Sequence, residues 1–266
     1  MEFLKLVRRR SFLSEVVYMI LNIALAIALV VVIRYTESIP LAIGLVIVSK
    51  WRVLAVRPRY WFANIRSNLV DFIVSISVVL HMYTINSANI EDSQKLLLLG
   101  IATVLYIAWL LFLKPRSRRS AVAAQAGVAV ILGIAALFTI SYNWPVSIVV
   151  LGMWLIGFAA ARHVLATYDE ETHGLFISLA YGIVLAEIGW VAYHWAIAYS
   201  LPFVMTLLVP QVAIIALLVS FVGFKAYDSF YHHDKIRTND IILPLLFTLS
   251  VIAVLVFVFN RVGTTI

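Results

Sequence analysis

Nine long apolar stretches, separated by short polar connections, limit how this chain can fold more than any other feature. They cover residues 16–33, 39–56, 67–85, 96–113, 121–140, 146–165, 174–199, 202–224 and 241–260. A helix needs about 17–25 apolar residues to cross the hydrocarbon core of a bilayer. The longest connection, Lys225 to Asp240, is too short for a soluble domain. The sequence therefore predicts an all-α polytopic integral membrane helical bundle of about nine transmembrane helices, forming a single domain over residues 1–266.

Composition supports a membrane protein and excludes several other classes. Hydrophobic residues make up 64% of the chain and charged residues 12%, whereas soluble domains are about half apolar and a quarter charged. The chain has no cysteine, which excludes disulfides, thiolate metal sites and cysteine nucleophiles. The net charge of +7 comes from loops rather than from a folded basic domain, so we expect no nucleic-acid partner.

The basic residues predict how the bundle is oriented. With the N-terminus in the cytoplasm, 17 of the 20 Lys and Arg residues fall on the cytoplasmic side, and only Arg34, Lys95 and Arg261 lie outside. This bias predicts a cytoplasmic N-terminus and an outside C-terminus in a multi-pass protein of the cell (plasma) membrane, or inner membrane. The basic and aromatic segment 57–66 should lie along the cytoplasmic interface and attract anionic lipid headgroups.

Two N-terminal stretches need a closer reading. The first follows a basic arm, as in a signal sequence, but its apolar run continues to Ile33, so we expect an uncleaved span. The 39–56 stretch begins with Ser38 and Pro40, a helix-start pattern, but carries Lys50 and Arg52 in its last third. A re-entrant segment would place the basic arm opposite the other basic loops, so the charge pattern favours a full span.

The 174–199 stretch combines a packing pattern with ionisable side chains. Its small residues recur every four positions and form one helix face: Gly174, Ser178, Gly182 and Ala186. Such a face lets a second helix approach closely, so we expect this helix to be central. Glu187 and His194 are seven residues apart and share a neighbouring face, and an ionisable group near mid-span is costly without a partner.

A polar layer around Glu187 is the first candidate site. Pro210 cannot donate to the carbonyl of Thr206, so the 202–224 helix should kink there and expose that carbonyl beside Gln211. His194 and His81 should lie at similar depth near the outer face. Such a layer could relay protons or hold a cation, while the alternative is a structural hydrogen bond that clamps the helices together.

A metal site at the cytoplasmic face is the second candidate. Its potential ligands lie in the loops before residue 174 and after residue 224: His163, Glu170, His173, His232 and His233. Imidazoles and carboxylates suit zinc, manganese or iron, although a solvated polar loop explains the same residues.

Three functions remain open from the sequence. The leading hypothesis is a transporter or channel-like protein for a small solute or ion, with Glu187 as its protonatable group. The first alternative is a non-catalytic subunit or scaffold, which could form a homo-oligomer or bind a membrane partner through the small-residue faces of the 121–140 and 174–199 helices. The second is a metal-dependent enzyme using the cytoplasmic loops. We expect no organic cofactor, because no nucleotide-binding or nucleophile motif occurs.

Overall fold

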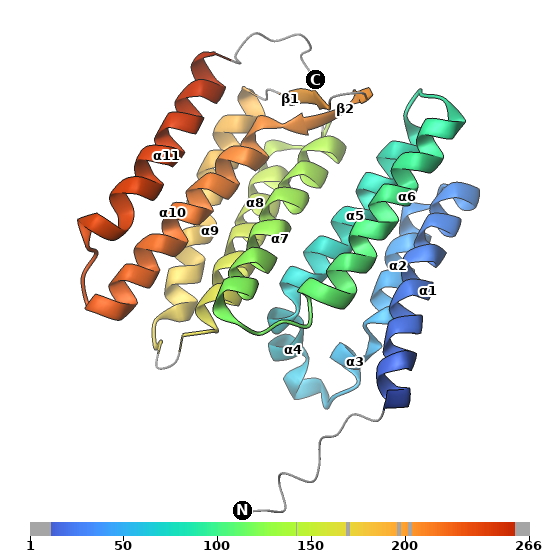
Figure 1. Cartoon of the computed structure of the whole chain (residues 1–266), viewed down its shortest axis with the longest axis horizontal. Helices are drawn as coiled ribbons and strands as arrows, with labels where there is room; N and C mark the ends of the chain where they lie inside the picture. The colour runs from blue at the N-terminus through green and yellow to red at the C-terminus, as the bar shows by residue number, and fades with distance from the viewer. Residues whose placement is uncertain (1–11, 142, 169–170, 196–197, 202–203, 259–266) are drawn as a thin grey trace, which may run out of the picture.

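The computed structural model describes residues 12–141, 143–168, 171–195, 198–201 and 204–258, and it is almost entirely helical (Figure 1). Within these residues, eight helices are long and apolar enough to cross a membrane. They are α1 (Phe12–Thr36), α5 (Leu69–Ser87), α6 (Asp92–Ala108) with its π-helical continuation η2 (Trp109–Leu113), α7 (Arg119–Ile140), α8 (Val146–Leu165), α9 (Gly174–His194), α10 (Gln211–His233) and α11 (Thr238–Phe257). The predicted all-α multi-pass fold is therefore confirmed.

The 39–56 stretch departs from the nine full spans that the sequence predicts. Its apolar part forms α2 (Ile39–Ser49), whose 11 residues extend only about 16 Å, half of a typical bilayer core. The helix starts as predicted, because the Ser38 hydroxyl accepts a hydrogen bond from the backbone N–H of Leu41. It ends where Lys50 interrupts the apolar run, so eight of the nine predicted spans form long apolar helices in the described chain and this one forms a short helix.

A basic elbow follows α2 and leads the chain into α5. It consists of α3 (Trp51–Leu54), η1 (Pro58–Tyr60) and α4 (Trp61–Ser67). Figure 1 places this elbow at the end of the bundle where α1 begins, so α2 and the elbow together return the chain to its starting end. The connections from α6 to α7, α8 to α9 and α10 to α11 lie at that same end. The basic loops are thus gathered on one face, and we call it the basic end.

The 202–224 stretch is the second departure. The chain first forms a two-stranded antiparallel hairpin, β1 (Ala198–Leu201) and β2 (Val204–Pro210), and α10 begins only at Gln211. The predicted kink at Pro210 is wrong, because Pro210 is the N-cap of α10 and lies outside the helix. A proline has no N–H to donate, so a helix start suits it better than a helix interior. At its other end α10 continues to His233, nine residues beyond the predicted end.

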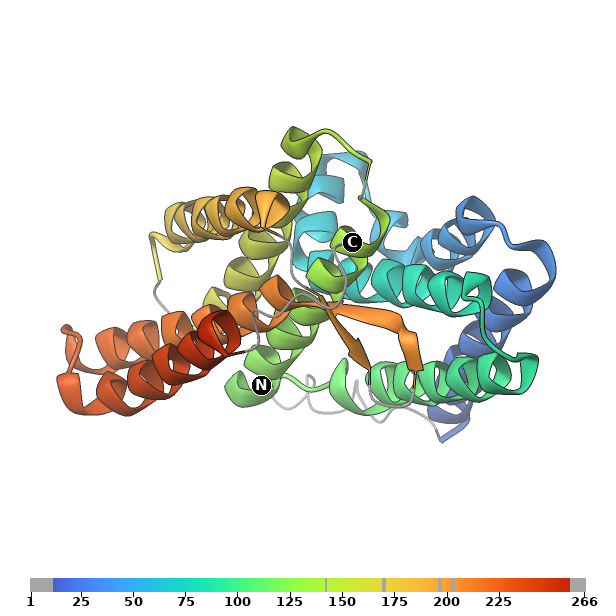
Figure 2. The same cartoon turned by 90° about the horizontal axis from the view of Figure 1, so that it is seen from above.

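The small-residue face of α9 is a packing seam, as predicted, and it faces α8. Gly182 lies against Trp154, where an added Cβ would stand 3.0 Å from the backbone oxygen. Gly189 extends the seam, since its Cβ would lie 2.4 Å from Cγ of Met153. The expectation that this helix is central is wrong. α9 packs mainly on α8, whereas α7 contacts α5, α8 and α10 and is the most buried span (Figure 2).

The buried side chains form two clusters that meet at the middle of the bundle. The first is built mainly from α1, α2, α5 and α6, and the second from α7 to α10. They join where α5 packs on α7 and α8. Figure 2 shows the two groups of helices on either side of α7 and α8. α11 packs mainly on α10, and Thr248 is its buried residue within the described part of the chain.

Candidate functional site

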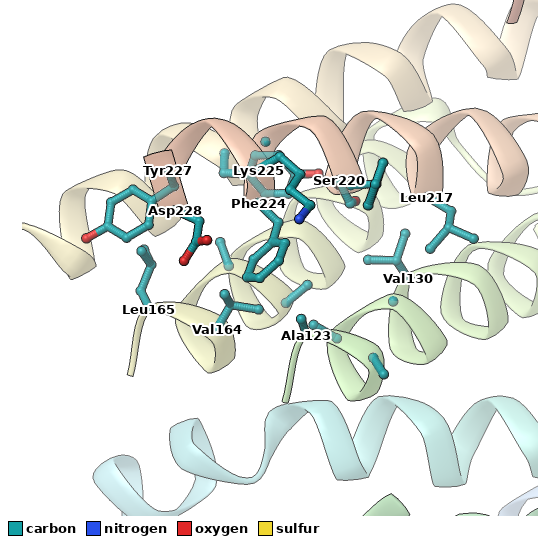
Figure 3. A pocket seen from close by; sticks show the side chains of 18 of the residues that line it. Ala123, Val130, Val164, Leu165, Leu217, Ser220, Phe224, Lys225, Tyr227 and Asp228 are labelled. Carbon is teal, nitrogen blue, oxygen red and sulfur yellow. Dashed lines mark hydrogen bonds between the residues drawn. The ribbon is translucent and has the colours of Figure 1, made fainter. Parts of the chain in front are cut away.

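A stripe of residues on α10 forms one wall of a large pocket. Leu217, Ser220, Phe224 and Asp228 recur every three or four positions and therefore share one face of the helix. Because α10 continues to His233, the charged residues after Phe224 extend this face instead of forming a loop. The stripe therefore runs from apolar side chains near mid-helix to charged ones at the basic end (Figure 3).

The opposite walls come from α7, α8 and α9. α7 presents small residues to the pocket, among them Ala123, Ala124 and Gly127, and α8 adds Ala160, Ala161 and Val164. Short side chains on facing helices leave space between α7 and α10, and the pocket has a volume of about 820 Å³. Pockets that hold small molecules have volumes of roughly 300–1,000 Å³. We call this space the α7–α10 pocket.

One polar contact lies deep within the apolar part of the α7–α10 pocket. The hydroxyls of Tyr181 on α9 and Ser220 on α10 are 2.6 Å apart. The Ser220 hydroxyl also donates to the backbone carbonyl of Ala216, 2.6 Å away. Ser220 therefore gives its proton to the backbone and accepts from Tyr181, which joins α9 to α10 across the pocket.

Asp228 organises the polar end of the α7–α10 pocket. Its Oδ1 accepts a hydrogen bond from the Tyr168 hydroxyl at 3.0 Å, and it lies 3.6 Å from both Nη1 of Arg119 and Nδ1 of His232. The Arg119 guanidinium also stacks over the rings of Tyr168 and Tyr231, at 4.2 and 5.3 Å from their centroids. Burial, followed by the bond to the Asp228 carboxylate, raises the pKa of Tyr168 above its usual value, so this hydroxyl remains a donor.

A smaller polar chamber adjoins this end. Its volume is about 420 Å³, and it shares three lining residues with the α7–α10 pocket: Lys225, Asp228 and His232. Its far side is closed by Asp240, whose Oδ2 accepts a hydrogen bond from the Ser229 hydroxyl at 2.7 Å and lies 3.7 Å from Nε2 of His233. The apolar pocket and the polar chamber together form an amphipathic site that is polar at the basic end.

A buried ionic cluster lies in the other half of the bundle, also near the basic end. Asp71 on α5 is 8% exposed, and its Oδ2 accepts from Lys50 and, at 2.8 Å, from Nζ of Lys114. Its Oδ1 accepts from the Trp109 indole N–H at 3.4 Å. The Ser75 hydroxyl donates to the Asp71 backbone carbonyl at 2.7 Å. The cluster ties α2, α5 and η2 together.

Gln125 on α7 holds the end of the π-helical segment in place. Its side-chain N–H groups donate to the carbonyls of Leu113 and Arg116 at 2.7 and 2.9 Å. Its Oε1 is 2.7 Å from Nε2 of His163 on α8, so this imidazole nitrogen must be the donor. Lys114 follows η2 directly, so Gln125 and Asp71 fix the turn on both sides.

The structure disperses the predicted polar layer. Glu187 and His194 are exposed on α9, and within the described part of the chain no hydrogen bond or ion pair joins them. His81 lies on α5, and its buried Nε2 has no hydrogen-bond partner among the described residues. Thr206 is in strand β2, and Gln211 is buried at the start of α10. The kink that would bring these residues together is absent from α10 as described, and a transport role for them stays a prediction.

The predicted metal ligands also lie apart. Among the described residues, no group of three or more His, Asp or Glu side chains is arranged to hold a metal ion. His163 faces Gln125, His173 is exposed, and His232 and His233 contact different carboxylates. Glu170 lies outside the residues that the structure describes.

Sequence reasoning missed the residues of the α7–α10 pocket. Lys225, Asp228 and His232 were expected in a loop because charge follows the apolar run at Phe224. Their spacing of three and four residues continues the helical face of Leu217 and Phe224, and this periodicity was the available signal. The small residues of the 121–140 stretch were read as packing positions, whereas Ala123 and Gly127 line the pocket.

Comparisons with protein-family models, with curated proteins and with solved structures found no match to this chain. A function must therefore be inferred from the pocket and its residues.

Proposed function

We propose that this multi-pass membrane protein is a transporter that binds a small amphipathic solute in the α7–α10 pocket. The observation that carries the proposal is a pocket of about 820 Å³ whose walls are apolar along the helices and charged at the basic end. An apolar pocket with a few convergent polar groups is the usual form of a small-molecule site. Such a site suits a solute with an apolar body and a polar head.

The position of the pocket favours transport over a purely structural role. It begins at Arg119 and Asp228, near the basic end, and reaches Val130, near the middle of α7, and Leu217, in the N-terminal third of α10. A solute bound there would be halfway across the bundle. Part of the small-residue faces that could have bound a partner protein packs within the chain, since Gly182 lies against Trp154 and Gly133 against Ile73.

Glu187 does not line the α7–α10 pocket. Tyr181 faces the pocket, and Glu187 is six residues further along α9, which turns it by about 240° to the other side of the helix. The sequence-based hypothesis made Glu187 the protonatable transport residue. The pocket supports transport with the solute bound between α7 and α10, without Glu187 in contact with the solute.

Flux across proteoliposomes tests the proposal. Three probes share a ten-carbon chain and differ in their head: decyl phosphate, decyltrimethylammonium and decyl glucoside. We expect at least one to cross faster than in protein-free vesicles. Gly127→Leu should abolish this flux by filling the pocket, because a Cβ there already approaches Cδ1 of Leu217 to 3.2 Å.

The matched control is Gly100→Leu, on α6, where a Cβ meets nothing within 4 Å. It should leave the flux unchanged, and equal unfolding transitions in the two variants would exclude misfolding as the cause. If no probe moves faster than in empty vesicles, or if Gly127→Leu transports like the unmodified protein, a transport site in this pocket is ruled out.

A further inference from the structure

The charges at the polar end of the α7–α10 pocket identify the head of the solute. Two basic and two acidic side chains line the pocket end and the adjoining chamber: Arg119, Lys225, Asp228 and Asp240. Each acid is already engaged. Asp228 accepts from the Tyr168 hydroxyl and lies beside Arg119, and Asp240 accepts from Ser229. Two histidines, His232 and His233, also lie beside these acids.

Lys225, like Asp228, lines both the pocket and the chamber, so its side chain stands at the boundary between the apolar and polar spaces. It differs from the other three charged residues in its contacts. Across the described residues, its ammonium takes part in no hydrogen bond or ion pair. Figure 3 shows its nitrogen beside Phe224, among the side chains of the pocket. A bound anion would give this ammonium an acceptor and a counter-charge that the described residues do not supply.

A cationic head fits this end poorly. It would meet Lys225 and Arg119, and the carboxylate of Asp228 is held by the Tyr168 hydroxyl, whose raised pKa keeps it a donor. A neutral head would leave the ammonium without a counter-charge. An anionic head would supply oxygens to Lys225 and gain charge-assisted hydrogen bonds.

We propose that the α7–α10 pocket selects an anionic amphiphile, with its phosphate or carboxylate head on Lys225 and its apolar chain in the apolar part of the pocket. This inference rests on the proposed transport function, since it names the class of solute for the same pocket. The same chemistry is offered by a free amphiphile from water and by an anionic lipid of the bilayer. Arg119 stays paired with Asp228 at the polar end of the pocket.

The test is equilibrium binding of the three ten-carbon probes to the full chain in nanodiscs of neutral lipid, with empty nanodiscs as the reference. We expect decyl phosphate to bind about tenfold more tightly than decyl glucoside, as one charge-assisted hydrogen bond implies. Lys225→Gln should reduce this preference to within about twofold, whereas Lys225→Arg should keep it. Lys235→Gln, an exposed basic residue outside both spaces, is the matched control and should bind like the unmodified protein.

Two results would contradict the preference for an anionic head without contradicting the pocket as a binding site. One is equal binding of all three probes that Gly127→Leu still abolishes, and the other is an unchanged phosphate preference in Lys225→Gln. Binding no stronger than to empty nanodiscs would overturn both this inference and the proposed function. Repeating the titration in nanodiscs with added phosphatidylglycerol separates the sources. Competition would identify a bilayer lipid as the occupant, and its absence a free amphiphile.

Discussion

At the scale of single residues, Asp71 stands out because one carboxylate pairs with two ammonium groups inside the bundle. Its side chain is 11% exposed, that of Lys50 is 6% exposed, and Lys114 is more open at 31%. Charges removed from water need close partners, and each of the two carboxylate oxygens of Asp71 has at least one. Removing the shared partner should therefore be far more damaging than removing an exposed charge.

We expect Asp71→Asn to lower the free energy of unfolding by about 3–5 kcal/mol, the usual cost of leaving a buried charge unpaired. Unfolding by SDS titration, followed by far-UV circular dichroism, measures the change. The control is Asp92→Asn, whose carboxylate pairs with Arg34 but is 69% exposed, and it should have little effect. The double variant Lys50→Met/Asp71→Leu should recover much of the loss, since apolar replacement of a buried pair is often tolerated. Equal stability of both single Asp variants would contradict this account of the cluster.

The sequence allowed only part of this residue-scale picture to be predicted. Asp71 and Lys50 were both visible as charges near the basic end of their stretches. Their pairing was not, because it depends on α2 ending at Ser49 and turning its next residue inward. For Glu187 the prediction and the structure differ. A carboxylate near mid-span predicts a partner inside the bundle, but the Glu187 side chain is exposed, because position along a helix does not fix which face is buried.

At the scale of elements, the contact between α8 and α9 depends on glycines. Gly189 leaves no room for a methyl group, since its Cβ would stand 2.4 Å from Cγ of Met153. We expect Gly189→Ala to destabilise the protein by about 1–3 kcal/mol through overpacking. Gly100→Ala should have the opposite sign, a gain of up to about 1 kcal/mol, because a Cβ meets nothing there and alanine favours a helix. SDS titration measures the stability of both variants. Stability changes of the same sign would contradict a close α8–α9 contact that depends on Gly189.

The elbow of α3, η1 and α4 is the element that should contact lipid headgroups. Phe62 is 88% exposed and Trp51 61% exposed, and Arg57, Arg59 and Arg66 lie in the same segment. Aromatic and basic side chains together favour the interface of an anionic bilayer. The chain has no cysteine, so a spin label on Phe62→Cys reports its own depth by electron paramagnetic resonance. We expect the label on Phe62→Cys to lie at the depth of the headgroups. The control, Asn89→Cys, should carry a fully aqueous label. An aqueous label at both positions would show that the elbow lies away from the membrane.

Most elements followed from apolar length, and the exceptions have a physical cause. Strand β2 is mostly apolar and runs directly into α10, so hydropathy alone could not distinguish it from a helical part of the same span. Pro210 was read as a kink, although a proline equally well begins a helix. Helix α10 begins and ends nine residues later than the predicted 202–224 helix. The charged residues after Phe224, which the sequence places in a loop, are therefore helical and line the pocket.

At the scale of the whole molecule, all the described basic loops lie at one end, together with the polar end of the α7–α10 pocket and the Asp71 cluster. From this asymmetry the positive-inside rule predicts that the basic end faces the cytoplasm. If the basic end is cytoplasmic, the pocket opens toward the cytoplasm and the hairpin lies at the outer face. The proposed solute would then enter or leave on the cytoplasmic side, so the orientation decides the direction in which the site is accessible.

Single-cysteine labelling tests this orientation, and again no native cysteine must be removed. Asn89 is exposed between α5 and α6, Ser117 between α6 and α7, and Glu15 at the start of α1. With a membrane-impermeant maleimide on intact cells, we expect Asn89→Cys to react at once, and Ser117→Cys and Glu15→Cys only after lysis. The reverse pattern would place the basic end and the pocket entrance outside. Labelling of Glu15→Cys and Ser117→Cys from opposite sides would mean that the 11-residue α2, with its elbow, does not return the chain across the bilayer.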